Sequence, residues 1–321
     1  MRDYTFCDPN SKPILVCYNL SQMFGFGDKK IRLATHSNRF HTDDVFATAV
    51  LMLFLKDKEI EIVRTRDEEI IKSADYVYDV GGIYDESLNR FDHHQEGGAG
   101  ARENGIPYSS FGLVWKKFGK ELCGSEEVAD FLDKKIVQFI DAMDSGVKTF
   151  KENNDETKIY LFIDAVDAFN PFWPEEEKFD ERFFEIVAFA KRVLQREIER
   201  AKNLEDAKSI LKKIYDETDD KRIIYLDKNY PWENILNKYP EPVFVVKARG
   251  EGMCSVNSVR DNIYSFETRK LFPESWAGKS GKELADITGV KDAIFCHNKR
   301  FICSAKSKEG AIKLAQLALQ Q

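Results

Sequence analysis

The chain alternates short apolar runs with longer stretches of helical spacing, and the short runs end at histidine or aspartate. Ile31–Thr35 stops at His36, and Tyr76–Val80 carries Asp79 at its end. Between them, Asp43–Leu55 is apolar nearly all round, which indicates a buried helix. This alternation predicts an α/β fold in which helices flank a mainly parallel sheet. Ligands of such sheets bind at the carboxyl ends of the strands, which favours a site near His36 and Asp79.

The rest of the chain predicts two domains. A helical region over Phe179–Lys213 is charged and amphipathic, and it separates the N-terminal pattern from a strand-rich C-terminal part. We therefore expect a domain over residues 1–210 that ends in a helical linker, and a smaller α/β domain over residues 220–321. Further elements are predicted as strands at Ile60–Thr65, Ile223–Leu226, Val243–Arg249 and Ile294–Cys296, and as helices at Asp67–Ser73, Ser109–Gly119, Val128–Asp144 and Gly310–Leu319.

Composition limits the cellular setting of the chain. With 321 residues, 43% of them hydrophobic, it can bury a large core, yet its apolar runs are too short to span a membrane. Met1–Asn10 lacks the features of an export signal, and the six cysteines form no Cys-x-x-Cys pair, so we expect reduced thiols and a cytoplasmic location. A net charge of -7 argues against a general nucleic-acid coat.

Four of the five histidines fall in two clusters beside aspartates. His36 and His41 belong to A-T-H-S-N-R-F-H-T-D-D, and His93 and His94 belong to R-F-D-H-H-Q. Imidazole and carboxylate ligands without cysteine suit Mn²⁺, Mg²⁺ or Zn²⁺, and this mixture favours Mn²⁺. Six or more such groups could hold two ions, and a two-ion site is typical of phosphoester hydrolysis.

Each aspartate taken singly has a plainer explanation. Asp43 and Asp44 stand at the start of a predicted helix, where a carboxylate caps backbone amides, although capping needs only one of the two. Asp79 precedes two glycines and could be a turn residue. Asp141 and Asp144 could be satisfied by donors near a helix end. The metal site is predicted by the joint pattern of these residues.

Seven segments follow one another along the chain: A-T-H-S-N-R-F-H-T-D-D, Y-D-V-G-G-I-Y-D, R-F-D-H-H-Q, S-S-F-G-L-V-W, D-A-M-D-S-G, L-F-P-E-S-W-A-G and F-C-H-N-K-R-F-I. In this order they resemble the motifs of the MYG1 family, a branch of the DHH phosphoesterase superfamily. The resemblance implies an N-terminal DHH-type catalytic domain with a mainly parallel sheet and a C-terminal substrate-binding domain similar to DHHA1. It also implies a manganese-dependent 3′-to-5′ exonuclease acting on RNA, the activity attributed to the eukaryotic branch of the family.

The resemblance also implies roles for single residues. One metal would be bound by His36, His41 and Asp79, and a second by Asp43, Asp79, His93 and Asp144, with Asp79 as the bridge. His94 would lie beside the scissile phosphate, and Asp92 would orient the histidines. The first motif of the superfamily usually has an aspartate where His41 stands and one residue fewer after the first histidine. This difference affects the assignment of His36 as a ligand more than that of any other residue in the set.

The C-terminal segment departs from the family pattern. Relatives carry a glycine pair that brings backbone amides close to the substrate, and Cys303 and Ser304 occupy these positions. A set of basic residues could still bind phosphates, although a solvated surface explains them equally well. They are Arg269, Lys270, His297, Arg300 and Lys306.

Three functions stay open on these grounds. The first is hydrolysis of RNA or short oligonucleotides by two metal ions. The second is hydrolysis of small phosphoesters such as cyclic dinucleotides, nucleotides or pyrophosphate. The third is a non-catalytic role in which the metal stabilises a protein that binds nucleic acid or a partner. We expect no membrane partner, and a homo-oligomer is compatible with each function.

Overall fold

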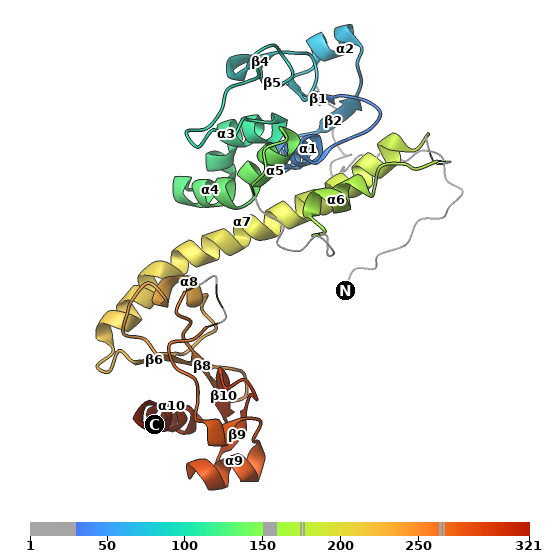
Figure 1. The fold of residues 1–321 in the computed structure, drawn as a ribbon. Helices are drawn as coiled ribbons and strands as arrows, with labels where there is room; N and C mark the ends of the chain where they lie inside the picture. The colour runs from blue at the N-terminus through green and yellow to red at the C-terminus, as the bar shows by residue number, and fades with distance from the viewer. Residues whose placement is uncertain (1–29, 150–158, 174, 176, 263–264, 266) are drawn as a thin grey trace, which may run out of the picture. The chain divides into compact units, whose positions relative to one another are not determined.

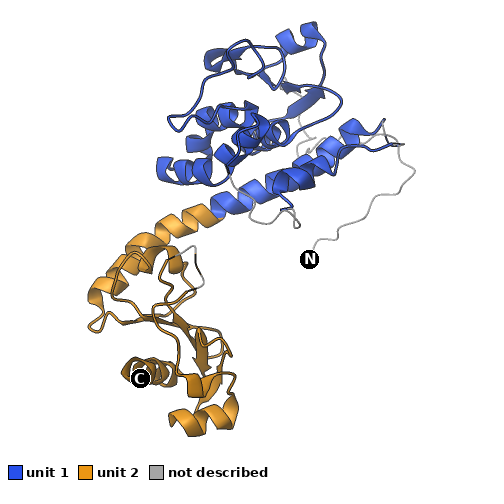
Figure 2. Ribbon diagram, in the orientation of Figure 1, with its two compact units in different colours: residues 1–199 blue, residues 200–321 orange. Residues whose placement is uncertain are grey.

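A computed structural model describes residues 30–149, 159–173, 175, 177–262, 265 and 267–321. Met1–Asn10 and two of the six cysteines, Cys7 and Cys17, lie outside these residues. The chain divides into two compact units, Met1–Glu199 and Arg200–Gln321, and the division falls inside a long helix, α7 (Phe179–Glu217) (Figure 2). Each unit holds one five-stranded sheet with helices, so the predicted α/β class is confirmed (Figure 1).

The sheet of the first unit has the strand order β2-β1-β3-β5-β4. Its strands are β1 (Ile31–Thr35), β2 (Ile60–Arg64), β3 (Tyr76–Tyr78), β4 (Tyr84–Asp85) and β5 (Arg90–Phe91). The first four in this order pair in parallel, and β4 pairs with β5 antiparallel. Because β2, β1, β3 and β5 run the same way, their carboxyl ends meet at one edge of the sheet.

The helices of the first unit include those expected from the sequence, together with α6 (Phe162–Asp167) and a 3-10 turn that were not predicted. They are α1 (Thr42–Phe54), α2 (Glu68–Ser73), α3 (Ser110–Cys123), α4 (Glu126–Leu132), α5 (Gln138–Asp144), α6 (Phe162–Asp167) and most of α7, with a 3-10 turn at Glu86–Leu88. The single helix expected over Val128–Asp144 is interrupted by a π-helical segment, Asp133–Val137. The apolar spacing is compatible with one continuous helix, so it does not predict this interruption.

Helix α1 forms the centre of the first unit. Every residue from Thr42 to Leu51 is buried, and the helix packs against α3 and α5. Thr48 bonds the hydroxyl of Tyr78 at 2.7 Å, which ties α1 to the last residue of β3. This packing fixes the amino end of α1 relative to the carboxyl ends of the strands.

The sheet of the second unit has the order β6-β7-β8-β10-β9. Its strands are β6 (Ile223–Leu226), β7 (Phe244–Ala248), β8 (Cys254–Ser258), β9 (Ala293–Cys296) and β10 (Ile302–Ala305). The helices of this unit are the carboxyl end of α7, α8 (Glu233–Leu236), α9 (Gly281–Thr288) and α10 (Lys308–Gln320), with a 3-10 turn at Glu274–Trp276. The sequence did not predict β8 and β10, because serine and asparagine interrupt their apolar pattern. Cys303 and Ser304 lie in the middle of β10 and pair with Val256 and Ser255 of β8.

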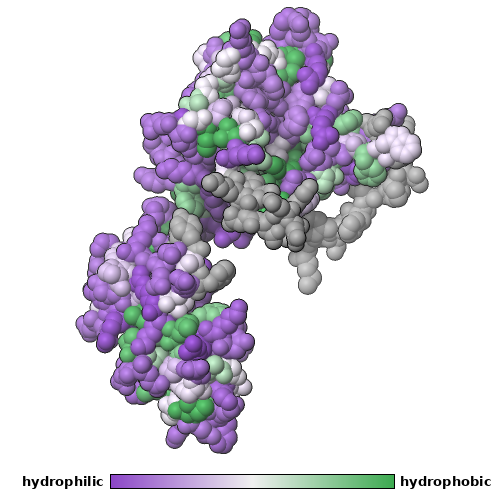
Figure 3. Space-filling model, viewed as in Figure 1, coloured by the Kyte–Doolittle hydropathy of each residue, from purple (hydrophilic) through white to green (hydrophobic). Residues whose placement is uncertain are grey.

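Three properties of the described residues bear on the expectations from composition. None of the helices among the described residues has the length and apolar character that a membrane span requires. The face in Figure 3 is mainly hydrophilic, with separate apolar patches on both units. Four buried cysteines among the described residues form no disulfide bond: Cys123, Cys254, Cys296 and Cys303.

Candidate metal centre

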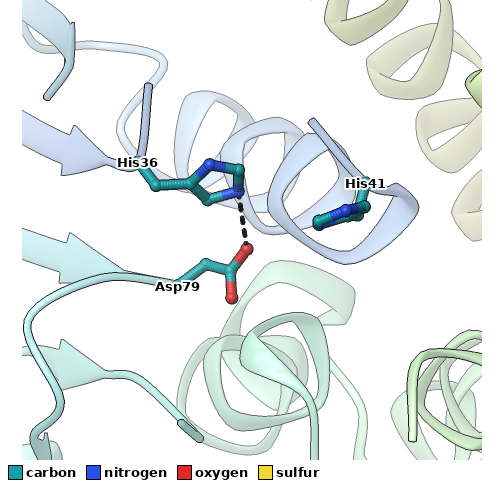
Figure 4. A group of neighbouring side chains, drawn as sticks. All are labelled: His36, His41 and Asp79. Atoms are coloured by element: carbon teal, nitrogen blue, oxygen red, sulfur yellow. Dashed lines mark ion pairs between the residues drawn. The ribbon is translucent and has the colours of Figure 1, made fainter. Parts of the chain in front are cut away.

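Three connections at the carboxyl edge of the first sheet carry the candidate ligands. His36 follows β1, Asp79 follows β3, and Asp92, His93 and His94 follow β5. Asp79 adopts a left-handed backbone (φ 55°), a conformation that aspartate tolerates better than most residues, and Gly81 and Gly82 follow with positive φ. In Figure 4 the rings of His36 and His41 and the carboxylate of Asp79 gather between the ends of β1 and β3 and the first turn of α1.

At the amino end of α1, the structure shows which of Asp43 and Asp44 caps the helix. Asp44 Oδ1 accepts a hydrogen bond from the backbone amide of His41 at 2.9 Å, so Asp44 caps the helix. Asp43 is buried, and neither of its carboxylate oxygens accepts a hydrogen bond from the described residues. The capping explanation therefore applies to Asp44 and leaves Asp43 without a structural partner.

Short distances join the histidines to the aspartates on both sides of Asp79. His36 Nε2 lies 3.1 Å from Asp79 Oδ2 and 3.3 Å from Asp44 Oδ2. His93 Nε2 lies 3.2 Å from Asp79 Oδ1. The same nitrogen is 3.7 Å from Asp43 Oδ2 and 3.5 Å from Asp144 Oδ2. Asp79 thus faces one histidine with each of its oxygens.

Four sets of side chains bring ligand atoms within 4.8 Å of one another. They are His36 with His41 and Asp79; Asp43 with His93 and Asp144; Asp79 with His93 and His94; and Asp43 with Asp44 and Asp79. The six residues proposed as metal ligands from the sequence all fall in these sets. Asp44 joins them as a member that the sequence analysis assigned no metal role.

Unpartnered polar atoms test whether these residues fit a metal. Five buried atoms at this edge lack a hydrogen bond of ordinary geometry within the described part of the chain: His36 Nε2, both carboxylate oxygens of Asp43, Asp44 Oδ2 and Asp79 Oδ2. Buried polar atoms without partners are costly, and a cluster of them is best explained by an ion that they share. Nitrogen and oxygen donors without sulfur match Mn²⁺, Mg²⁺ or Zn²⁺, so the donor set fits the metals expected from the sequence.

The pKa values of the carboxylates reflect crowding of negative charge. Burial, with the charges of Asp79 and Asp144, raises the pKa of Asp43 well above its usual value. Burial and the charge of Asp79 raise the pKa of Asp44 to about 7. Burial alone would also raise the pKa of Asp79, but its contacts with His36 and His93 outweigh burial and hold that pKa below its usual range. Asp79 is therefore ionised, and its negative charge disfavours ionisation of Asp43 and Asp44.

Asp92 organises the Asp-His-His segment instead of joining a metal set. Its Oδ1 accepts bonds from the backbone amides of His93 at 2.7 Å and His94 at 3.1 Å, and it lies 2.7 Å from Nδ1 of His94. Its Oδ2 accepts a bond from the Gly82 amide at 2.6 Å. The bond to Asp92 raises the pKa of His94 to about 9, so this half-exposed imidazole is protonated at neutral pH.

Asp141 has a structural role. It is fully buried, and it accepts bonds from Ser109 Oγ, the Gly112 amide and Arg102. A Cβ at Gly112 would lie 2.0 Å from Asp141 Oδ2, so glycine is needed for the carboxylate to reach the start of α3. Asp144, three residues later, points instead toward His93.

A pocket of about 340 Å³ opens beside the cluster. Its lining residues are His36, His41, Arg66, Asp79, Val80, Gly81, Gly82, Asp92 and His94. Arg66 was not identified from the sequence, although its place just after β2 is the signal that could have found it. The neighbouring Arg64 is buried, and it binds the Asn38 carbonyl and Asp180, which holds the loop between His36 and His41 in place.

Three of the basic residues predicted to bind substrate in the second unit donate hydrogen bonds to backbone carbonyls. Arg269 donates hydrogen bonds to the carbonyls of residues 237, 239, 240 and 242, and Lys270 and Arg300 also donate to backbone carbonyls. His297 and Arg300 lie in the turn before β10, whereas the exposed Lys306 follows its other end. Their role in substrate binding stays a prediction.

Comparison with known proteins agrees with the resemblance seen in the motifs. The model of the family described as Uncharacterised protein family (UPF0160), named MYG1_exonuc, matches residues 32–319. The MYG1 exonuclease of Homo sapiens is 30% identical over 90% of this chain and 86% of its own length. The MYG1 protein of Dictyostelium discoideum is 28% identical over 91% and 97%, and that of Chlamydia pneumoniae is 30% identical over 90% and 96%. With its histidine and aspartate motifs gathered at one sheet edge, this chain belongs to the MYG1 family.

Proposed function

We propose that this chain is a manganese-dependent phosphodiesterase that removes nucleotides from the 3′ end of RNA or short oligonucleotides. The observation that carries the proposal is the position of Asp79, whose two oxygens lie 3.1 Å from His36 and 3.2 Å from His93. A carboxylate between two ligand sets is the arrangement that a pair of ions requires. The name exonuclease printed for the human relative supports the same reaction class.

The residues divide into two ligand sets that share Asp79, as in the DHH phosphoesterases that the motifs resemble. His36 and His41 would bind one ion with Asp79, while Asp43, His93 and Asp144 would bind the second with Asp79. Bound ions would lower the pKa of a water molecule and neutralise charge on the phosphate.

His94 is placed to act on the phosphate itself. It lines the pocket, its side chain is 61% exposed, and the bond to Asp92 keeps it protonated at neutral pH. A cationic imidazole at this position stabilises negative charge that develops on the phosphate, and it can donate a proton to the leaving oxygen. Asp92 holds that ring in one orientation through Nδ1 and leaves Nε2 to face the substrate.

The size of the pocket supports action at a chain end. About 340 Å³ is near the lower limit of ordinary ligand pockets and suits a single nucleotide unit. A substrate that enters as a terminus requires no wider groove in the first unit. Small phosphoesters meet the same size requirement, so they belong in the assay panel.

The test uses the purified protein with Mn²⁺ and an RNA labelled at its 5′ end. We expect a ladder of products that shortens from the 3′ end, and no products with Asp79→Ala or His93→Ala. Asp57→Asn, a change at an exposed carboxylate in the turn after α1, is the matched control and should retain full activity. The proposal fails if RNA, DNA, cyclic dinucleotides and pyrophosphate all stay intact with Mn²⁺, Mg²⁺ and Zn²⁺.

A further inference from the structure

Arg66 lies at the same sheet edge as the metal cluster, in the connection between β2 and α2. The Thr65 amide donates a bond to the Thr35 carbonyl at 2.7 Å, so β2 stays beside β1 up to the point where His36 begins. Asp67 caps α2 through the amides of Glu69 and Ile70, and its own amide bonds Thr65 Oγ1. The backbone on both sides of Arg66 is therefore fixed, and its side chain lines the pocket with His36, Asp79 and His94.

The guanidinium of Arg66 is uncommitted, unlike those of its neighbours. Arg39 pairs with Asp167, and Arg64 pairs with Asp180 and lies 4.4 Å from the ring centroid of Phe183. Among the described residues, Arg66 forms neither a hydrogen bond nor an ion pair, and it is exposed.

The nearby carboxylates have other partners, which explains why Arg66 does not pair with them. Both oxygens of Asp92 accept bonds from the Gly82, His93 and His94 amides. Asp79 is nearly fully buried and contacts His36, His93 and Ser110. An arginine held at the pocket by a rigid turn, beside carboxylates that are turned inward, is available to an anion that enters from solvent.

We propose that Arg66 binds the non-bridging oxygens of the scissile phosphate in the pocket. A guanidinium presents two parallel N–H groups that match two phosphate oxygens, whereas a lysine ammonium provides only a point charge. Arg66 supplies positive charge from the protein on the substrate side of an aspartate cluster. This role rests on the proposed phosphodiesterase function and adds a substrate-binding residue from the first unit to those expected from the sequence.

The variants Arg66→Ala and Arg66→Lys test this role with two substrates, 3′-hydroxyl RNA and bis(p-nitrophenyl) phosphate. Loss of one preorganised donor to a developing phosphate charge lowers kcat by about 10²–10³-fold. We expect Arg66→Ala to lower kcat/KM by that factor on both substrates and Arg66→Lys to recover part of the loss. Mn²⁺ affinity by calorimetry should stay unchanged, because Arg66 belongs to no ligand set. Lys58→Ala, at an exposed lysine outside the pocket, is the matched control.

A binding measurement separates this role from a general effect on turnover. Fluorescence anisotropy with a labelled phosphorothioate RNA and Mn²⁺ should show weaker binding by Arg66→Ala, with a salt dependence reduced by about one unit of slope. Wild-type activity together with full activity of Arg66→Ala would overturn the role of Arg66 alone. A loss confined to RNA would overturn its assignment to the scissile phosphate. An inactive wild type would instead refute the proposed function.

Discussion

The cluster of buried carboxylates makes a specific prediction for Asp43→Asn. Asp43 is 1% exposed, and its two oxygens have no hydrogen-bond partner within the described chain. Ligand atoms of Asp43, Asp44 and Asp79 lie within 4.8 Å of one another. Without metal, a charge on Asp43 is repelled by its neighbours and is cut off from water. Asparagine keeps the shape of the side chain and removes that charge.

The effect of Asp43→Asn on stability is expected to differ with and without metal. At 4.8 Å two like charges repel by about 3 kcal/mol for an effective dielectric constant of about 20. The raised pKa of Asp43 limits this repulsion, because the group can take up a proton. We therefore expect Asp43→Asn to stabilise the metal-free protein by about 1–3 kcal/mol. Excess Mn²⁺ at about 100 times its Kd stabilises the wild type by about 2.7 kcal/mol per site, and the variant should lose this gain at one site.

Thermal unfolding at pH 7.5 measures both effects. In EDTA the Tm of Asp43→Asn should exceed that of the wild type by roughly 2–10 °C, and Mn²⁺ should raise the Tm of the wild type more than that of the variant. Asp57→Asn, at an exposed site, should change neither value. The reasoning is refuted if Asp43→Asn lowers the Tm in EDTA, or if Mn²⁺ stabilises the variant as much as it stabilises the wild type.

The remaining predictions concern the pH dependence set by Asp44 and His94 and the structural roles of Asp141 and Arg269. In EDTA, the pKa of Asp44, raised to about 7, makes the free energy of unfolding depend on pH. The stability that Asp44 contributes is complete below about pH 4 and is lost as the pH rises through 7, about 4 kcal/mol in all. Chemical denaturation at several pH values would measure this loss. In the proposed mechanism the protonated form of His94 is the active one, so kcat/KM should fall as the pH rises through about 9, and Asp92→Asn should move this fall to lower pH. Asp141→Ala should lower the free energy of unfolding in urea by about 3 kcal/mol, because Arg102 loses one of its partners. The number of Mn²⁺ ions bound, measured by calorimetry, should stay unchanged. Loss of one ion would instead show that Asp141 is a metal ligand. Arg269→Ala should cost about 2 kcal/mol through its bonds to four carbonyls, and a loss of substrate affinity at unchanged stability would favour phosphate binding instead.

Elements with strong periodic patterns could be predicted closely from the sequence. The strand Ile31–Thr35 and the strand Ile223–Leu226 have the expected bounds, and the long helix differs only at its end, Glu217 in place of Lys213. β8 was not predicted, because Val256 is the only branched apolar residue among its five residues. A polar side chain on a sheet face depends on what covers that face, which local sequence does not specify.

The position of the site could also be predicted, because it follows from the direction of parallel strands. His36 and Asp79 each come directly after a strand, and strands that run the same way bring such residues to one edge. The order of the motifs was enough to identify the MYG1 family, and the family comparison confirmed it.

Local sequence patterns set where strands end and helices start, and so which residue types gather at the sheet edge. What each aspartate does there depends on the folded structure: Asp44 caps α1 while Asp43 has no hydrogen-bond partner among the described residues, and Asp141 binds Arg102 while Asp144 faces His93. Equivalent carboxylates a few residues apart differ in the donors that surround them. Those donors come from segments distant in the sequence, so the fold must bring them together before a structural carboxylate can be distinguished from a metal ligand.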